Sequence, residues 1–318
     1  MLYHGGDEKV RIAFLNLCHC EPQIVARVTK KLTADPDFDM YIHVDAKQDI
    51  RLFQEALADA RQTYFIQNRQ KVYWGGYNAI RATFALLQEA LESERGYDYF
   101  VLLQNLDYPI RSNEEIKSFF EKNKGTEFIR GCNIGRTKDR HYQKKYKIYN
   151  RRDDDFYLSN PTKFQKYLQY IKMLSHSITT IGFNGVIKEK GQAFSIHYGA
   201  AQWAVTRDCA NYFVEFEKTH PKFNARMEHI QFPDEEYFHT IVHNSNFKYH
   251  CVAYDEPQKR WLVNWRNLHY FEFPKEVKVF DENDFDTIMA QKDMLFCRKV
   301  KSGISDKLMD RIDEATKK

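Results

Sequence analysis

The chain has 318 residues, of which 43 % are hydrophobic and 29 % are charged. This length and composition are ordinary for a globular chain with a substantial core, and they indicate one large domain or two tightly joined ones. The formal net charge of +4 is too small to argue for bulk nucleic-acid binding. No apolar run approaches the roughly 20 residues that a membrane span needs, and we expect no signal peptide before the first strand.

Six cysteines are scattered along the chain, and only Cys18-His19-Cys20 forms a cluster. As a zinc site the cluster lacks a second pair of ligands at the usual spacing. Buried free thiols at the end of a strand are therefore the favoured interpretation. A chain without a disulfide pattern is expected in a reducing, cytoplasmic setting.

Strands and helices alternate in the first half of the chain. The expected strands are Val10–Leu17, Met40–Val44, Thr63–Ile66, Tyr99–Leu103 and Glu127–Arg130. The expected helices are Glu21–Leu32, Asp49–Ala60, Tyr77–Leu91 and Asn113–Lys122. This alternation predicts an α/β fold with a mostly parallel sheet and helices on both faces. Ligands of such sheets bind beyond the carboxyl ends of the strands, where Asp45 and Asp107 lie.

Between Gly131 and Pro161 the alternation breaks. The segment Gly135–Arg152 is rich in lysine and arginine, with tyrosines interleaved. It is interpreted either as a solvated insertion with a basic face or as a loop that meets a phosphate-bearing or otherwise anionic ligand. Asp153-Asp154-Asp155 follows it. An Asp-x-Asp can hold a divalent cation, but this one does not follow a buried strand, so we expect its carboxylates to balance neighbouring Arg and Lys charges.

The second half mixes element types. The expected helices are Phe164–Leu174, Arg207–Lys218, Asp284–Gln291 and Ser305–Ala315. The expected extended segments are Ala193–His197, Gln202–Val205, Arg260–Val263, Lys278–Phe280 and Leu295–Val300. The chain has no G-x-G-x-x-G, P-loop or G-x-S-x-G sequence, so kinase, dehydrogenase and α/β-hydrolase interpretations lack their defining parts.

An acidic turn at Phe232–Ile241 carries the clearest chemistry. Three carboxylates, Asp234, Glu235 and Glu236, follow Pro233 and open a helical run. The simple interpretation is helix capping, since proline and acidic residues suit a first turn. The alternative is a general base, because neighbouring aromatic rings would shield a carboxylate from water.

Six segments, in order along nearly the whole chain, together resemble one family. They are Tyr41–Lys47 (YIHVDAK), Trp74-Gly75-Gly76, Leu102–Asn113 (LLQNLDYPIRSN), Gly199–Trp203 with Thr206-Arg207, Pro233–Thr240 (PDEEYFHT) and Leu295–Lys299 (LFCRK). The sequence resembles the core-2/I-branching β-1,6-N-acetylglucosaminyltransferases together with the peptide O-xylosyltransferases. It departs from their pattern at Gln104-Asn105, where they have Ser-Gly, so the local turn is expected to differ.

The resemblance implies a GT-A-like, Rossmann-type nucleotide-sugar-binding sheet in a single glycosyltransferase domain over residues 1–318. Residues 10–130 would form the nucleotide-binding half, and 131–318 the acceptor and catalytic half. It further implies an inverting transfer without a metal or other cofactor. The expected reaction moves a sugar, first of all GlcNAc, from a UDP-sugar to a hydroxyl of an oligosaccharide, polysaccharide or lipid-linked glycan and forms a β-linkage.

The resemblance also assigns roles to residues. Glu235 corresponds to the general base, Asp45 to the nucleoside contact, and Lys299 to the diphosphate contact. Lys275 is the best match to a second basic residue, and Trp74 and Asp107 match segments that line the cleft. Chemistry supports this division, because an inverting transfer needs one base, and the departing diphosphate needs a metal ion or fixed cations. Lys299, Lys275 and the basic segment 136–152 are the available cations.

Two alternatives stay open. Xylose transfer is the first, since His239-Thr240 and Asn264-Trp265 lean toward the xylosyltransferase branch. A non-catalytic UDP-sugar-binding protein is the second, although an intact Glu235 argues against it. Luminal family members carry an anchor and disulfides, so the sequence resembles a bacterial-type, cytoplasmic relative in polysaccharide biosynthesis. Peripheral contact with the inner face of a membrane remains open.

Overall fold

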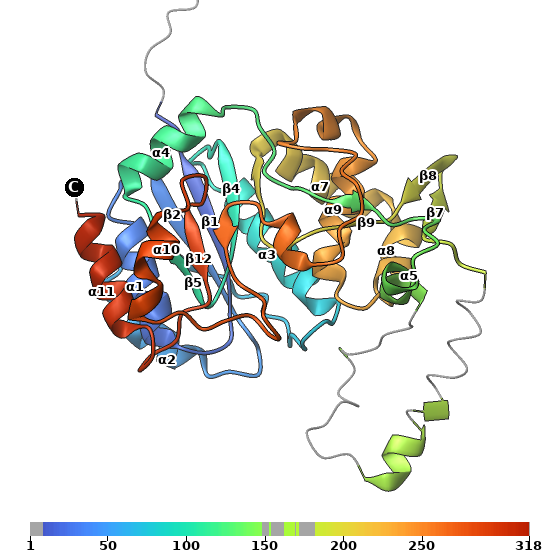
Figure 1. Ribbon diagram of the computed structural model, residues 1–318, viewed down its shortest axis with the longest axis horizontal. Helices are drawn as coiled ribbons and strands as arrows, with labels where there is room; N and C mark the ends of the chain where they lie inside the picture. The colour runs from blue at the N-terminus through green and yellow to red at the C-terminus, as the bar shows by residue number, and fades with distance from the viewer. Residues whose placement is uncertain (1–8, 148–152, 154–161, 169, 172–181, 318) are drawn as a thin grey trace, which may run out of the picture.

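A computed structural model describes residues 9–147, 153, 162–168, 170–171 and 182–317. Its centre is a five-stranded sheet in the order β10-β4-β1-β2-β3 (Figure 1). The strands are β1 (Ile12–Cys18), β2 (Phe38–Val44), β3 (Thr63–Phe65), β4 (Tyr99–Gln104) and β10 (Ala204–Thr206). Strands β1 to β4 pair in parallel, and β10 runs antiparallel to β4. The predicted α/β fold with a mostly parallel sheet is confirmed.

The sheet is buried on both faces because its strands are apolar on both sides. In β1, Ile12 and Phe14 join one hydrophobic cluster, while Ala13 and Leu15 join the other. The first cluster includes side chains of α1 (Pro22–Leu32), α2 (Ile50–Ala56), α4 (Asn113–Lys122), α10 (Phe285–Met289) and α11 (Asp306–Ala315). The second includes side chains of α3 (Asn78–Glu92), α5 (Arg140–Lys147), α7 (Arg207–Thr219), α8 (Pro221–Met227) and α9 (Tyr237–His243). Helices therefore cover both faces, as expected (Figure 1).

Three smaller sheets are also described, and one of them joins the second half of the chain to the first. Strand β12 (Phe296–Arg298) pairs with β5 (Asp107–Pro109) and with β11 (His269–Tyr270). Strand β6 (Cys132–Asn133) pairs with β9 (His197–Tyr198), and β7 (Val186–Glu189) forms a hairpin with β8 (Gln192–Ser195). The 3₁₀ helices are η1 (Pro233–Glu235), η2 (Asn246–His250), η3 (Leu262–Trp265) and η4 (Glu282–Asp284). Pairing of β12 with β5 places the Leu295–Lys299 motif beside the end of β4.

Three strand predictions are wrong. Glu127–Arg130 makes only isolated bridges, because Glu127 pairs with Cys251 and Phe128 with Ala204 on different segments. Arg260–Val263 runs into the 3₁₀ helix η3, and Lys278–Phe280 is irregular. The apolar pattern of the last segment reflects the packing of buried Phe280, whose ring stacks on Tyr270. Arg260–Val263 is not buried, since Trp261 is 67 % exposed.

The basic segment expected as a loop contains helix α5, which buries Tyr142 and Tyr146 between its charged residues. The two tyrosines are four residues apart and so share one face of the helix. The expected helix Phe164–Leu174 is described in part: residues 163–168, 170 and 171 are helical, and the remainder lies outside the described residues.

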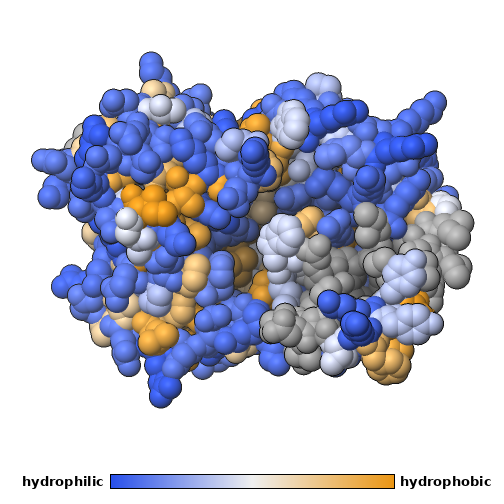
Figure 2. Space-filling view, turned by 60° about the horizontal axis from the view of Figure 1, so that its bottom comes forward, coloured by the Kyte–Doolittle hydropathy of each residue, from blue (hydrophilic) through white to orange (hydrophobic). Residues whose placement is uncertain are grey.

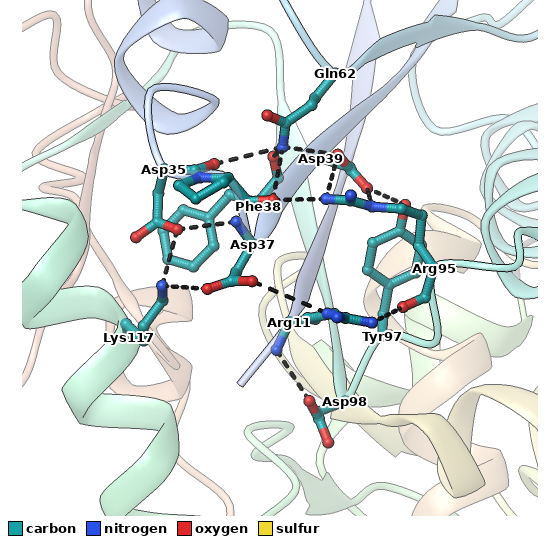
Figure 3. A network of polar contacts seen from close by, with 11 residues as sticks. Arg11, Asp35, Asp37, Phe38, Asp39, Gln62, Arg95, Tyr97, Asp98 and Lys117 are labelled. Atoms are coloured by element: carbon teal, nitrogen blue, oxygen red, sulfur yellow. Dashed lines mark hydrogen bonds and ion pairs between the residues drawn. The ribbon is translucent and has the colours of Figure 1, made fainter. Parts of the chain in front are cut away.

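A polar network ties the amino ends of the strands together (Figure 3). Lys117 contacts Asp35 at 2.8 Å and Asp37 at 2.7 Å, while the Arg95 Nε lies 2.8 Å from a carboxylate oxygen of Asp39. Asp39 is fully buried, and paired cations are what make such burial tolerable. These charges are engaged at the amino edge of the sheet, so ligand chemistry belongs at the opposite edge. No helix in the described ranges has the length and apolar character of a membrane span.

Candidate active site

The carboxyl ends of β1 and β4 are joined by Asn105. Its Oδ1 accepts hydrogen bonds from the backbone N–H groups of His19, at 2.6 Å, and Cys20, at 2.7 Å. Its own N–H donates to the carbonyl of Leu17 at 3.0 Å. The departure from the family pattern at this position thus has a structural use, since the amide holds the loop after β1. Cys18, at the end of β1, is a buried free thiol, as expected.

Asp45 lies just beyond β2 and is buried. One of its oxygens accepts from the backbone N–H of Lys47 at 2.9 Å, and the other lies 2.5 Å from the Lys47 Nζ. The same ammonium group lies 4.4 Å from the centre of the Tyr73 ring. The structure therefore places Asp45 at the expected sheet edge, with Lys47 as a partner that the sequence analysis did not single out.

Lys299 follows β12 and lies near the loop after β1. Burial lowers the pKa of His19, and the charges of Arg298 and Lys299 lower it further against the opposing pull of Asp45. Burial and Glu21 raise the pKa of Cys20, which the same two cations oppose. Within the described ranges, no carboxylate forms an ion pair with Lys299. The charges of Asp45 and Lys299 thus both act on His19, with opposite effects on its pKa.

Asp107 is a buried anchor for Arg298. Its Oδ1 lies 2.7 Å from Arg298 Nη1, and its Oδ2 accepts from the Gln104 N–H at 2.7 Å and lies 3.3 Å from His269 Nε2. Burial would raise the pKa of Asp107, but Arg298, His269 and the Gln104 N–H together hold it below its usual range. Asp107 is therefore tied to protein groups through both oxygens. Arg298 was missed in the sequence, although it directly precedes Lys299.

The acidic turn is held by its backbone against the end of β9. The carbonyl of Glu235 accepts a hydrogen bond from the N–H of Gly199 at 2.9 Å. A side chain at Gly199 would not fit, because its Cβ would lie 2.2 Å from the Arg130 carbonyl and 2.5 Å from the His239 ring. The glycine of the Gly199–Trp203 motif is thus needed for this close approach.

Helix capping does not explain the three carboxylates. Neither η1 nor α9 receives a side-chain hydrogen bond at its N-cap. The acids gather instead around Lys145 of α5, whose Nζ donates to Glu235 Oε2 at 3.0 Å. Burial would lower the pKa of Lys145, but Glu235, Glu236 and Asp234 together raise it.

The neighbours of Glu235 are held differently from it. Burial and the charge of Glu235 raise the pKa of Asp234 to about 7, against the opposing charges of Lys145 and Arg298. Burial raises the pKa of Glu236 well above its usual range, and among the described residues neither of its side-chain oxygens has a hydrogen-bond partner. Arg298 lowers the pKa of Asp234 as well as that of His19, so its charge acts both on the acidic turn and on the loop after β1.

The Trp74-Gly75-Gly76 loop lies beside the acidic turn. The Trp74 side chain is 79 % exposed, and its ring meets the Phe232 ring edge-on at 4.5 Å. The Phe232 N–H donates to the Gly75 carbonyl at 3.3 Å. A Cβ at Gly76 would lie 2.1 Å from an oxygen of Asp153, so the loop is closely packed. Trp74 therefore lies beside the acidic turn, and its assignment to the cleft stays a prediction.

Asp153 has a different partner from the one expected. Its Oδ2 accepts from the backbone N–H of Asn78 at 2.7 Å, at the first turn of α3. We expected Asp153–Asp155 to balance neighbouring Arg and Lys charges. For Asp153 this is wrong, because its hydrogen bond goes to a backbone N–H in the first turn of α3, which has no partner within the helix. Asp154 and Asp155 lie outside the described residues. The described part of the chain holds no group of three or more metal-ligating side chains.

Lys275 is exposed in the loop after β11. No contact among the described residues ties it to Asp45 or Lys299, and its assignment stays a prediction.

Figure 2 is turned so that the carboxyl edge of the sheet comes forward, and it shows a hollow in the middle of this face. The site thus combines a shielded carboxylate with fixed cations, which suits proton removal and stabilisation of an anionic leaving group.

The fold is that of an α/β protein with a mostly parallel sheet, a class whose ligands bind beyond the carboxyl ends of the strands. More specifically, the chain belongs to the Core-2/I-Branching enzyme family, whose model matches residues 12–289. The family predicted from the six segments is therefore confirmed, and the chain carries a glycosyltransferase domain.

Curated relatives bear xylosyltransferase names. The chain is 23 % identical over 331 residues to "Xylosyltransferase oxt" of Drosophila pseudoobscura pseudoobscura, covering 97 % of this chain and 34 % of that protein. It is 23 % identical over 332 residues to the Drosophila melanogaster protein of the same name, covering 96 % and 33 %. A 126-residue stretch is 32 % identical to "Xylosyltransferase 2" of Canis lupus familiaris, covering 38 % and 14 %. The chain thus spans about a third of the first two relatives.

Proposed function

We propose that the protein transfers a sugar from a UDP-sugar to an acceptor hydroxyl, with inversion at the anomeric carbon and without a metal ion. The observation that carries this proposal is a shielded carboxylate, Glu235, together with Arg298, which is held by Asp107 and whose charge acts on Asp234 of the acidic turn and on His19 after β1. The carboxylate of Glu235 takes the proton of the acceptor hydroxyl while its oxygen bonds to the anomeric carbon. The bond from that carbon to the β-phosphate oxygen breaks, and UDP leaves.

Fixed cations would do the work that a metal ion does in other transferases. Lys299 and Arg298 are proposed to stabilise the developing diphosphate charge, and Asp107 pairs with Arg298. Asp45 is proposed to contact the nucleoside, with Lys47 beside it. Trp74 is proposed to line the acceptor side, because its exposed ring stands next to the catalytic turn.

Two donor sugars are candidates. GlcNAc follows from the branching enzymes of the family, and xylose is favoured by the names of the curated relatives. The acceptor is proposed to be a glycan, with a polypeptide hydroxyl as the alternative.

A donor panel tests the proposal. UDP release is measured for UDP-GlcNAc, UDP-xylose, UDP-glucose and UDP-galactose, with and without mono- and disaccharide acceptors. We expect one donor to dominate and acceptor to raise the rate. Tight UDP binding without turnover of any donor would instead support a non-catalytic UDP-sugar-binding protein.

A further inference from the structure

Lys145 differs from the other cations of α5. Its side chain is only 16 % exposed, whereas Arg140, Lys144 and Lys147 are exposed. Its Nζ lies 3.0 Å from Glu235 Oε2 and 3.9 Å from the centre of the Tyr198 ring. Tyr198 is itself buried at the end of β9. One lysine of a basic helix is thus turned inward and held by a carboxylate and an aromatic face.

The surroundings explain why a cation is needed there. Three acids are consecutive in the chain, and all of them act on Lys145. Like charges at this spacing favour protonation of one another, and burial adds to the effect. The side chain of Glu235 is 17 % exposed, so water screens it only in part. Lys145 therefore supplies a positive charge beside three neighbouring carboxyl groups.

We propose that Lys145 is a positioning residue for the base: it keeps Glu235 ionised and orients its carboxylate. The proposal rests on the proposed function. Lys145 binds Oε2, and no described residue donates a hydrogen bond to Oε1, so that oxygen is left for the acceptor hydroxyl. During transfer the hydroxyl proton moves to Glu235, which becomes a neutral carboxylic acid. Lys145 stays protonated throughout and gives up no proton.

The proposal is tested through the pH dependence of kcat/KM. We compare native enzyme, Lys145→Gln, Lys145→Arg and, as a control for loss of one positive charge, exposed Lys188→Gln on β7. Lys145→Gln should lose about tenfold or more near pH 6 and recover toward the native value near pH 9, because a higher pH favours an ionised base without help from Lys145. The donor KM should change little. Lys145→Arg should largely keep the native profile, and Lys188→Gln should match it.

A second variant guards against misfolding. In Lys145→Ala, added methylammonium should restore part of the activity at low pH if the cation itself is needed. A Lys145→Gln profile that parallels the native one, or loss in Lys145→Ala that methylammonium does not relieve, would overturn the proposal. Failure of the proposed function gives a different result: native enzyme without turnover, or Glu235→Gln as active as native.

Discussion

Glu235 is placed by two contacts that involve different parts of the residue. Its carbonyl accepts from the Gly199 N–H, and its carboxylate accepts from Lys145. The other candidate acids are less suited to act as the base. Glu236 is fully buried, and Asp107 already has partners at both oxygens. At the scale of single residues, position and access therefore select one acid among several.

Replacing Glu235 by Gln should abolish most turnover and leave the fold intact. The amide keeps the shape and the backbone contact but cannot accept the acceptor proton. We expect kcat to fall by about 10²- to 10⁴-fold, the usual worth of a positioned base, with UDP binding retained. Turnover and UDP affinity are measured on the same preparation. Near-normal turnover would move the base to Asp107 or Glu236.

Lys299→Ala should weaken UDP much more than uridine. A charge-assisted contact to the diphosphate is worth about 1.5–3 kcal/mol, and uridine has no phosphate to lose it. Calorimetric titration with both ligands measures the difference, with Lys275→Ala beside it. Lys275 is exposed, and no described contact links it to Asp45 or Lys299. We therefore expect Lys275→Ala to weaken UDP binding less than Lys299→Ala does. Equal weakening of uridine and UDP by Lys299→Ala would show that the lysine packs structurally.

Individual elements depend on partners from elsewhere in the chain. Helix α3 has no side-chain cap from Tyr77, the residue at its own N-cap. Asp153 supplies that contact through Asn78, and the carboxylate comes from a segment 75 residues further along the chain. Gly76 makes room for it. The loop that carries Trp74 is thus held between Asp153 and the acidic turn.

Asp153→Ala should destabilise the protein by about 0.5–2 kcal/mol, the usual cost of losing a helix N-terminal hydrogen bond. Asp153→Asn keeps an accepting oxygen, so its loss should be smaller. Urea denaturation of the two variants and the native protein measures the free energy of unfolding. Equal stability of all three would remove the capping role.

Activity should persist in excess EDTA. If Lys299 and Arg298 neutralise the leaving diphosphate, removal of divalent ions changes nothing at the transition state. Turnover of Asp153→Asn and Asp155→Asn should differ from that of the native enzyme by no more than a few-fold, since neither acid would then act through a metal. Loss of activity in EDTA, with recovery on addition of manganese, would contradict the mechanism based on fixed cations. Asp153–Asp155 would then be the first candidate metal site.

At the scale of the whole molecule, both halves of the chain share their sheets and cores. Strand β10 extends the central sheet, and β12 pairs with β5. The second core also encloses polar groups. His197 and His243 stack with ring centres 4.9 Å apart, and His239 lies fully buried. Burial is the main cause that lowers the pKa of all three, to about 3 for His197 and His239 and about 4 for His243.

These histidines predict acid sensitivity. They are neutral in the fold, whereas in the unfolded chain they bind protons below about pH 6.5. Stability is therefore full above that pH and falls as the pH drops toward about 4, by up to about 1.4 kcal/mol per pH unit for each histidine. Thermal melting between these values measures the slope. His243→Gln should reduce the slope of stability against pH by the contribution of about one bound proton. An unchanged slope would contradict the idea that His243 is neutral in the folded protein.

Local sequence patterns determined much of the fold. The apolar runs of β1, β2 and β4 and the amphipathic pattern of α3 are sufficient to identify these elements, because burial on fixed faces imposes a period of two or of about 3.6 residues. The order of six short motifs identified the family, and motif position alone picked out Glu235, Asp45 and Lys299. Where an apolar pattern had another cause, as at Lys278–Phe280, the same reasoning predicted a strand that does not form.

Only the tertiary structure decided which charges work together. Local sequence does not show that Asp107 holds Arg298. It also does not show that Lys145 turns inward onto Glu235, or that Asp153 caps α3. Each contact joins residues tens to hundreds of positions apart, and its strength depends on burial, which local pattern does not report. The sequence by itself determined the elements, the family and the candidate base. The packing of distant segments decided which cations and acids share the site, because electrostatic interactions depend on distance in space and on exclusion of water.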